Sequence, residues 1–209
     1  MSLHHDHAFD DAPNEGPAPA GYARVLWVAL LVNALMFAVE VGAGVRAGSV
    51  SLLADAIDFF GDGANYALSL AVLSLHLAWR ARAALLKAGS MALFGAGVLA
   101  RALWSAWHGV VPEPATMGLV GLLAFAANVG VAVLLYRYRG GDANMRSVWL
   151  CTRNDALGNL AVIAAAAGVF GTGTSWPDLL VATAMALLAL TAAWSVTRHA
   201  LGELRAGRR

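Results

Sequence analysis

Long apolar runs separated by short polar breaks dominate this sequence. A helix needs about 20 mostly apolar residues to cross a hydrocarbon core of about 30 Å. Six runs meet this length, at residues 25–44, 50–78, 84–107, 116–135, 145–170 and 179–198. The breaks contain Gly, Pro and Arg, as in Pro112-Glu113-Pro114. The pattern predicts an all-α membrane protein with six transmembrane helices.

The same pattern divides the chain into three parts. We expect a disordered cytoplasmic leader at residues 1–22, a six-helix transmembrane domain at residues 23–199 and a short cytoplasmic tail at residues 200–209. The first apolar run is not a signal peptide, because it follows a polar leader and no small-residue cleavage site precedes a soluble domain.

Positive charge is distributed unevenly over the breaks. Most of the 14 Lys and Arg residues lie on the leader side, after the second and fourth runs, and in the tail. They include Arg80, Arg82 and Lys87 after the second run. Cytoplasmic loops carry an excess of Lys and Arg, so the sequence predicts that both termini are cytoplasmic.

Composition narrows the class further. The chain of 209 residues is 59% apolar and 13% charged, whereas a soluble domain averages roughly 25% charged residues. These values exclude a water-soluble enzyme domain and a disordered chain. A net charge of +1 argues against a nucleic-acid partner. Cys151, the single cysteine, excludes an intramolecular disulfide and a zinc module with several cysteines.

Three aspartates lie inside the second apolar run, where charges are costly and usually functional. Asp58 and Asp62 are four residues apart and therefore share one helix face. Asp55 and Asn65 extend this stripe by three residues in either direction. The spacing predicts a row of polar side chains that faces other helices.

The fifth run carries a second pair, Cys151 and Asp155, also four residues apart. At about 1.5 Å per residue, Asp58 and Asp62 lie roughly 12 and 18 Å below the outer boundary. Cys151 and Asp155 lie roughly 9 and 15 Å above the inner boundary. Asp155 thus matches the level of Asp58, and Cys151 that of Asp62. Two antiparallel helices would present four ligands near the midplane.

Such a group cannot stay ionised and empty in a medium of low dielectric constant. It should hold a metal ion or protons, and competition between the two is the basis of an antiporter. Carboxylate and thiolate ligands suit tetrahedral Zn²⁺. The sulfur also favours Cd²⁺ and disfavours Mg²⁺ and Ca²⁺.

Other polar residues are candidates for a supporting or pathway role. Within the spans these are Glu40, Asp55, Asn65, Asn154 and Asn159. Glu40 is either a proton carrier or entry ligand, or the partner of a neighbouring helix. In the leader, His4, His5 and His7 would collect metal on the cytoplasmic side, or they belong to a plain disordered tail.

Residues 40–62, EVGAGVRAGSVSLLADAIDFFGD, resemble the first two helices of the cation diffusion facilitator family. Residues 150–162, LCTRNDALGNLAV, are similar to its fifth helix. The resemblance covers all six runs and implies a proton-coupled exporter of Zn²⁺-like metals that forms a homodimer. By motif position it implies Asp58, Asp62, Cys151 and Asp155 as the transport-site ligands.

Two departures from that family affect the expectations. Cys151 stands where the family usually has His or Asp, which bears on metal preference. Most members also carry a cytosolic metal-binding domain after the sixth helix, where only residues 199–209 follow here. We therefore expect a short form whose dimer depends on membrane contacts, for example at Gly89, Gly95 and Gly97.

The leading hypothesis is a proton-coupled antiporter, not an enzyme. It would export Zn²⁺, and secondarily Cd²⁺, from the cytoplasm across a bacterial inner membrane. An alternative is a metal-dependent membrane enzyme such as a lipid alcohol phosphotransferase. That chemistry needs a longer acidic series with an arginine, which the second and third runs do not contain. A third hypothesis is a structural or sensor subunit that binds metal without moving it.

Overall fold

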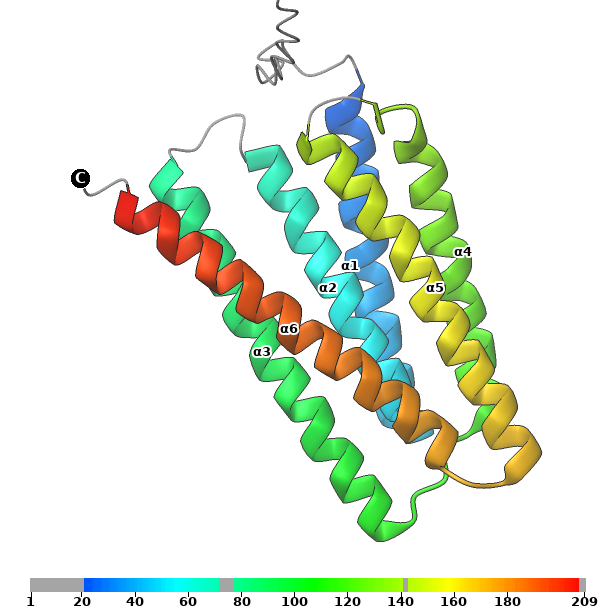
Figure 1. Cartoon of the computed structure of the whole chain (residues 1–209). Coiled ribbons are helices and arrows are strands. Elements are labelled where there is room, and N and C mark those ends of the chain that lie inside the picture. The colour runs from blue at the N-terminus through cyan, green and yellow to red at the C-terminus, as the bar shows by residue number, and fades with distance from the viewer. Residues whose placement is uncertain (1–20, 72–76, 141–142, 207–209) are drawn as a thin grey trace, which may run out of the picture.

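The computed structural model describes residues 21–71, 77–140 and 143–206. These residues form six helices and no strand, as predicted (Figure 1). The helices are α1 (Tyr22–Ala47), α2 (Val50–Ala71), α3 (Leu77–His108), α4 (Pro114–Tyr136), α5 (Ala143–Thr172) and α6 (Trp176–Ala206).

Five of these helices are long and apolar enough to cross a membrane. α2 is the exception, because three aspartates, Asp55, Asp58 and Asp62, lie within it. The predicted end of the second run at residue 78 was wrong, since Leu77 already begins α3. α6 extends beyond its predicted end to Ala206, through most of the segment expected to be a tail.

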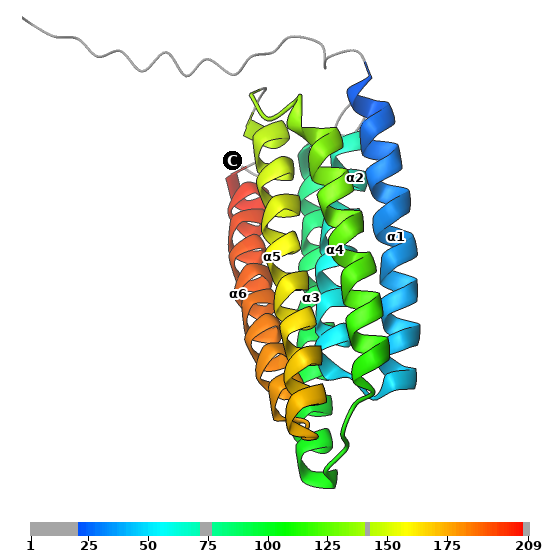
Figure 2. The same ribbon diagram turned by 90° about the vertical axis from the view of Figure 1, so that its right-hand side faces the viewer.

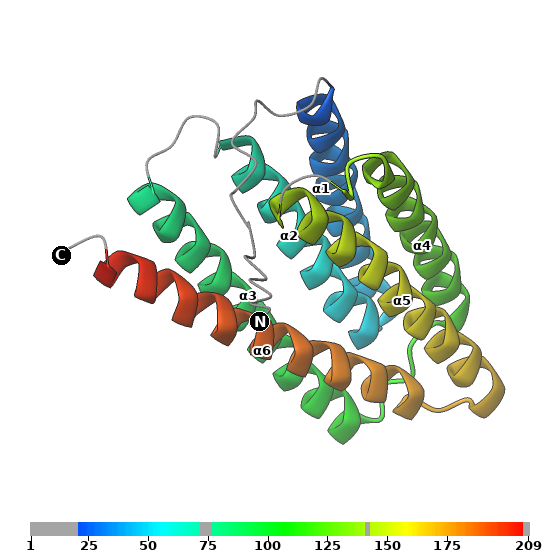
Figure 3. The same cartoon turned by 45° about the horizontal axis from the view of Figure 1, so that its top comes forward.

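The helices pack as three extensively contacting pairs, α1 with α2, α4 with α5, and α3 with α6. Figure 3 shows the α3–α6 pair beside the other four helices. Among the described helices only α2 contacts all five others. The helix with the most acidic side chains is thus the central one, because the surrounding helices remove its carboxylates from lipid.

Asp178, in the first turn of α6, fixes the start of α2. Its carboxylate accepts hydrogen bonds from the backbone N–H groups of Val50 and Ser51 at 2.8 and 3.0 Å. The Ser49 hydroxyl donates to the same carboxylate at 2.7 Å. The first N–H groups of a helix have no partner within it and attract negative charge. This fully buried cap therefore anchors α2 against α6.

α1 begins and α6 ends at the same end of the bundle (Figures 1 and 2). An even number of antiparallel helices produces this arrangement. Near that end α3 and α6 separate from α2, whereas at the other end short connections hold the helices together (Figure 1). One of these connections is tied by the Glu113 N–H, which donates to the carbonyl of Ala47 at 3.0 Å.

One predicted dimer contact lies inside the chain instead. A Cβ atom at Gly95 would lie 3.2 Å from the side chain of Leu190, so Gly95 packs α3 closely against α6. Gly89 and Gly97 have no neighbour within 4 Å at the corresponding position. The close packing of two antiparallel helices at small residues explains why Gly95 is buried in the α3–α6 contact.

Candidate ion-binding site

Hydrogen bonds between α2 and α5 set the level of the polar residues. Thr152 donates to Asp62 at 3.2 Å, and Asn159 donates to both carboxylate oxygens of Asp55 at 3.0 and 2.8 Å. The two contacts are seven residues apart on each helix and run in opposite directions. This antiparallel register differs by one residue from the predicted match between Asp62 and Cys151.

Asp62 is the centre of the contacts between these helices. Its side chain is 5% exposed, and its Oδ2 atom accepts hydrogen bonds from Tyr66 at 3.0 Å and from Thr152. The Tyr66 and Thr152 hydroxyl oxygens also lie within hydrogen-bond distance of each other, so one of the two hydroxyls can donate there instead of to Asp62. The Asp155 carboxyl group on α5 lies near the Asp62 carboxyl group.

Asp58 and Cys151 lie beside this pair and are half-buried. A Cβ atom at Gly158 would lie 3.9 Å from Asp58 Oδ2 and 3.9 Å from Asp55 Oδ1, so Gly158 leaves room for both carboxylates against α5. Electrostatic interactions link the Cys151 thiol with Asp62 and Asp155. All four predicted ligands therefore border one region between α2 and α5.

These side chains do not form a closed metal site in this arrangement. Among the described residues, no three His, Cys, Asp or Glu side chains are close enough to hold one metal ion. The reason is local: Asp62 is engaged by two hydroxyl groups, and buried Thr152 faces it where the neighbouring Cys151 was expected. Both hydroxyl groups contact Oδ2 of Asp62, so a cation that bound this oxygen would compete with them.

A second carboxyl pair joins α1 to α2. Glu40 is 0% exposed, and its oxygens accept no hydrogen bond from a described donor. Its carboxyl group is close enough to Asp55 to share a hydrogen bond. Asn128 donates to Asn159 Oδ1 at 2.9 Å, and Asn159 holds Asp55. The pair is thus the end of a buried polar chain that continues through α5 to α4.

Contrary to the prediction from the sequence pattern, Lys87 does not lie in a loop. It lies within α3 and is half-buried, and its ammonium donates to the amide oxygen of Asn65 on α2. Electrostatic interactions link it to Asp62, Cys151 and Asp155. Helix α3 starts earlier than predicted, so Lys87 lies three turns inside it rather than at its end.

Some predicted residues lie away from this region. Asn154 is exposed, and its side-chain oxygen accepts a hydrogen bond from Arg153. Arg153 is also exposed and stacks over the ring of Trp149 at 5.3 Å. His4, His5 and His7 lie outside the described residues.

Four residues of this polar region were not predicted from the sequence: Tyr66, Lys87, Asn128 and Thr152. The signal for Asn128 was an isolated amide in the fourth apolar run. The signals for Tyr66 and Thr152 were weaker, because a hydroxyl group within an apolar helix often bonds to its own backbone. Thr152 has this alternative too, because the Val148 carbonyl lies 3.1 Å from its hydroxyl and competes with Asp62 for the one proton.

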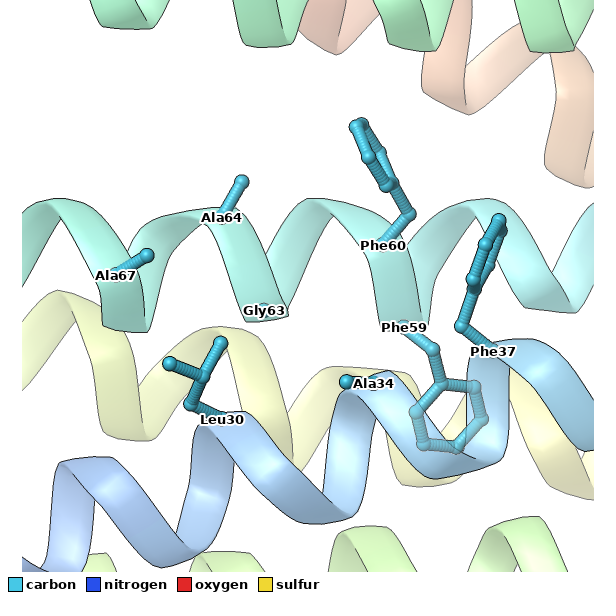
Figure 4. A pocket seen from close by; sticks show the side chains of 8 residues that line it. All are labelled: Leu30, Ala34, Phe37, Phe59, Phe60, Gly63, Ala64 and Ala67. Atoms are coloured by element: carbon cyan, nitrogen blue, oxygen red, sulfur yellow. The ribbon is translucent and has the colours of Figure 1, made fainter.

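An apolar groove of about 280 Å³ lies between α1 and α2, apart from the carboxyl pairs (Figure 4). It is lined by Leu30, Ala34, Phe37, Phe59, Phe60, Gly63, Ala64 and Ala67. The lining offers no oxygen, nitrogen or sulfur ligand from a side chain, so this groove is not a cation site.

Comparisons with known proteins agree with the membrane architecture. Residues 26–204 match the cation efflux transmembrane domain. The chain is 27% identical over 203 residues to the metal cation efflux system protein CzcD of Cupriavidus metallidurans, covering 90% of this chain and 64% of that protein. It is 27% identical over 211 residues to the zinc transporter ZitB of Pectobacterium atrosepticum, covering 94% and 65%.

A third relative is the cadmium, cobalt and zinc/H(+)-K(+) antiporter of Bacillus velezensis. The identity is 24% over 212 residues, covering 93% of this chain and 66% of the relative. The chain therefore spans about two thirds of the length of these proteins.

Proposed function

Because the chain belongs to the cation efflux family, we propose that it exports divalent transition-metal cations from the cytoplasm in exchange for protons. The family resemblance expected from residues 40–62 and 150–162 is confirmed. The chain is a multi-pass membrane protein of the bacterial cell membrane, as predicted. The family points to a transporter rather than to an enzyme, and nothing favours a lipid alcohol phosphotransferase.

The observation that carries this proposal is the proximity of the Asp62 carboxyl group on α2 and the Asp155 carboxyl group on α5. A proton held between two carboxyl groups would occupy the position that a cation would take between them. A divalent ion that enters must displace this proton, and a returning proton must displace the ion. Exchange at a single place therefore couples the two flows without a separate proton site.

We assign Asp58, Asp62, Cys151 and Asp155 as the metal ligands. Their common border between α2 and α5 supports the assignment. Asn65 and Asn159 support these ligands through their contacts with Lys87 and Asp55. A metal ion on Oδ2 of Asp62 would compete with the hydroxyls of Tyr66 and Thr152.

This set of ligands fits Zn²⁺ best as the transported ion, and Cd²⁺ next. Three carboxylates and one thiolate suit tetrahedral Zn²⁺, and the sulfur extends the range to softer Cd²⁺. The names of the relatives agree, since one is a zinc transporter and another a cadmium, cobalt and zinc antiporter. We therefore propose Zn²⁺ and Cd²⁺ as the metals that this chain transports.

Export requires a fixed orientation, and we propose that both termini are cytoplasmic. The predicted excess of Lys and Arg on that side and the common end of α1 and α6 support it. We further propose a homodimer formed by membrane contacts. Gly89 and Gly97 leave open surface on α3 that such a contact could use.

The test is metal flux in proteoliposomes that carry a pH gradient. Asp62→Asn removes the charge at nearly constant size, so we expect Zn²⁺ flux and the accompanying proton movement to be lost together. Asn154→Ala serves as the matched control, because Asn154 is exposed on α5 and lies away from the pair. Parental flux in Asp62→Asn, or Zn²⁺ flux that ignores the pH gradient, would contradict the proposal.

A further inference from the structure

Lys87 is the one described cation that reaches the acidic region between α2 and α5. It is half-buried on α3, and Asn65, to which its ammonium donates, lies three residues after Asp62 on α2. Its charge interacts with Asp62, Cys151 and Asp155. A positive charge from a third helix thus faces the place assigned to the metal.

The partner of this ammonium is an amide rather than a carboxylate. Asn65 positions the charge by accepting a hydrogen bond, but an amide is neutral and does not itself neutralise the ammonium. A direct ion pair with Asp62 would instead occupy the carboxylate. The arrangement keeps the cation near the carboxyl groups without blocking them.

Space beside Lys87 allows its side chain to move. A groove of about 400 Å³ lies between α2 and α3, and the residues that line it include Phe60, Ala64, Leu86, Ser90 and Lys87 itself. The Lys87 stem also passes Gly61, where a Cβ atom would lie 4.0 Å from its Cε. A flexible four-carbon stem carries a compact, strongly hydrated charge and can extend toward water along apolar walls.

We propose that Lys87 is a tethered counter-cation of the ion-binding site. Its ammonium offsets the negative charge of Asp62 and Asp155 when no metal is bound, and it withdraws along the α2–α3 groove when a metal ion enters. This inference rests on the proposed function, because it assumes that the metal binds between α2 and α5.

The arrangement has a kinetic consequence. A tethered cation that must withdraw before a divalent ion binds opposes that ion and keeps its affinity low enough for release. Removing the charge should therefore strengthen metal binding by about tenfold, as expected for the loss of one unit charge beside a partly hydrated site. Turnover should fall, because tighter binding slows release.

The experiment uses the full chain in detergent micelles and in liposomes, with Zn²⁺ as the probe. Lys87→Met keeps the length of the stem and removes the charge, and Lys87→Gln is the second variant in case the first does not fold. Lys87→Arg keeps the charge. We expect the neutral variants to lower the Zn²⁺ dissociation constant about tenfold and to lower both the half-saturating Zn²⁺ concentration and the maximal flux. Lys87→Arg should restore parental values.

Asp62→Asn separates this inference from the proposed site. If Asp62→Asn loses Zn²⁺ binding while the neutral Lys87 variants bind as the parent does, the site stands and the counter-cation is refuted. Equal changes in Lys87→Arg and Lys87→Met would also refute it, since the effect would not follow charge. If Asp62→Asn binds Zn²⁺ like the parent, the proposed site itself is wrong.

Discussion

Two carboxyl pairs share helix α2, and their surroundings differ. Glu40 and Asp55 are both fully buried, and Asn159 holds Asp55 with two hydrogen bonds. Asp62 lies seven residues after Asp55 on α2, and hydroxyl groups donate hydrogen bonds to it. Its partner Asp155 on α5 is half-buried. Among the described residues, Lys87 adds a positive charge only at the second pair.

The difference shows how the hydrogen-bond partners of a buried carboxyl group can fit it either for holding helices together or for exchanging ions. The Asn159 amide donates to both oxygens of Asp55 where four helices pack together, and this holds the carboxylate in one position. Releasing the carboxylate would leave buried polar groups without hydrogen-bond partners. Hydroxyl groups rotate and can bond to each other, as those of Tyr66 and Thr152 do. We therefore expect the Glu40–Asp55 pair to hold the helices together and the Asp62–Asp155 pair to exchange ions.

The largest contrast should come from neutralising one carboxyl group in each pair. Asp155→Asn removes a proposed ligand, so Zn²⁺ flux in liposomes should fall at least about 100-fold. Glu40→Gln gives Asp55 an amide donor in place of a carboxyl group, so flux should stay within about twofold of the parent. A loss of flux in Glu40→Gln equal to that in Asp155→Asn would remove the distinction between the pairs.

Truncating a carboxylate of the Glu40–Asp55 pair should lower the stability of the fold rather than the flux. Asp55→Ala leaves the side-chain amide of Asn159 without its acceptor, which should lower the free energy of unfolding by about 2–3 kcal/mol. Denaturant unfolding in micelles measures this cost. Asp58→Ala is the matched comparison on the same helix and should cost less, because the half-buried Asp58 has no such bidentate contact among the described residues.

Cys151 should set metal preference at the exchanging pair. Cys151→Ser replaces a soft sulfur with a harder oxygen, so flux of Cd²⁺ should fall by about tenfold relative to Zn²⁺. Cys151→His should favour Zn²⁺. Competition between the two metals in one flux assay measures the ratio, and unchanged selectivity in both variants would remove the thiol from the set of ligands.

The smallest effect should come from the hydroxyl that engages Asp62. Tyr66→Phe removes one hydrogen bond from the carboxylate, which is about 1 kcal/mol and corresponds to Zn²⁺ binding about fivefold tighter. Equilibrium titration of the metal in micelles would detect the change. Weaker binding in Tyr66→Phe would mean that the hydroxyl helps to form the metal site rather than competing with it.

Apolar runs were enough to predict six helices, because crossing a bilayer demands length and hydrophobicity, which are properties of each segment alone. The shared face of Asp58 and Asp62 followed from helical spacing, and their level opposite Cys151 and Asp155 from the rise per residue. These are local quantities, and the register between α2 and α5 agrees with the prediction to within one residue.

The partners of these residues depended on how the helices turn and cross. A rotation of one residue on α5 brings Thr152 rather than Cys151 to Asp62, and no periodicity in a single segment specifies that rotation. From the sequence, Lys87 was predicted to be a loop charge, whereas in the structure it donates a hydrogen bond to Asn65. Asn128 joins the polar chain only because it donates a hydrogen bond to Asn159. Hydrogen bonds and Coulomb interactions act over a few ångströms between separate helices, so only the tertiary packing could decide them.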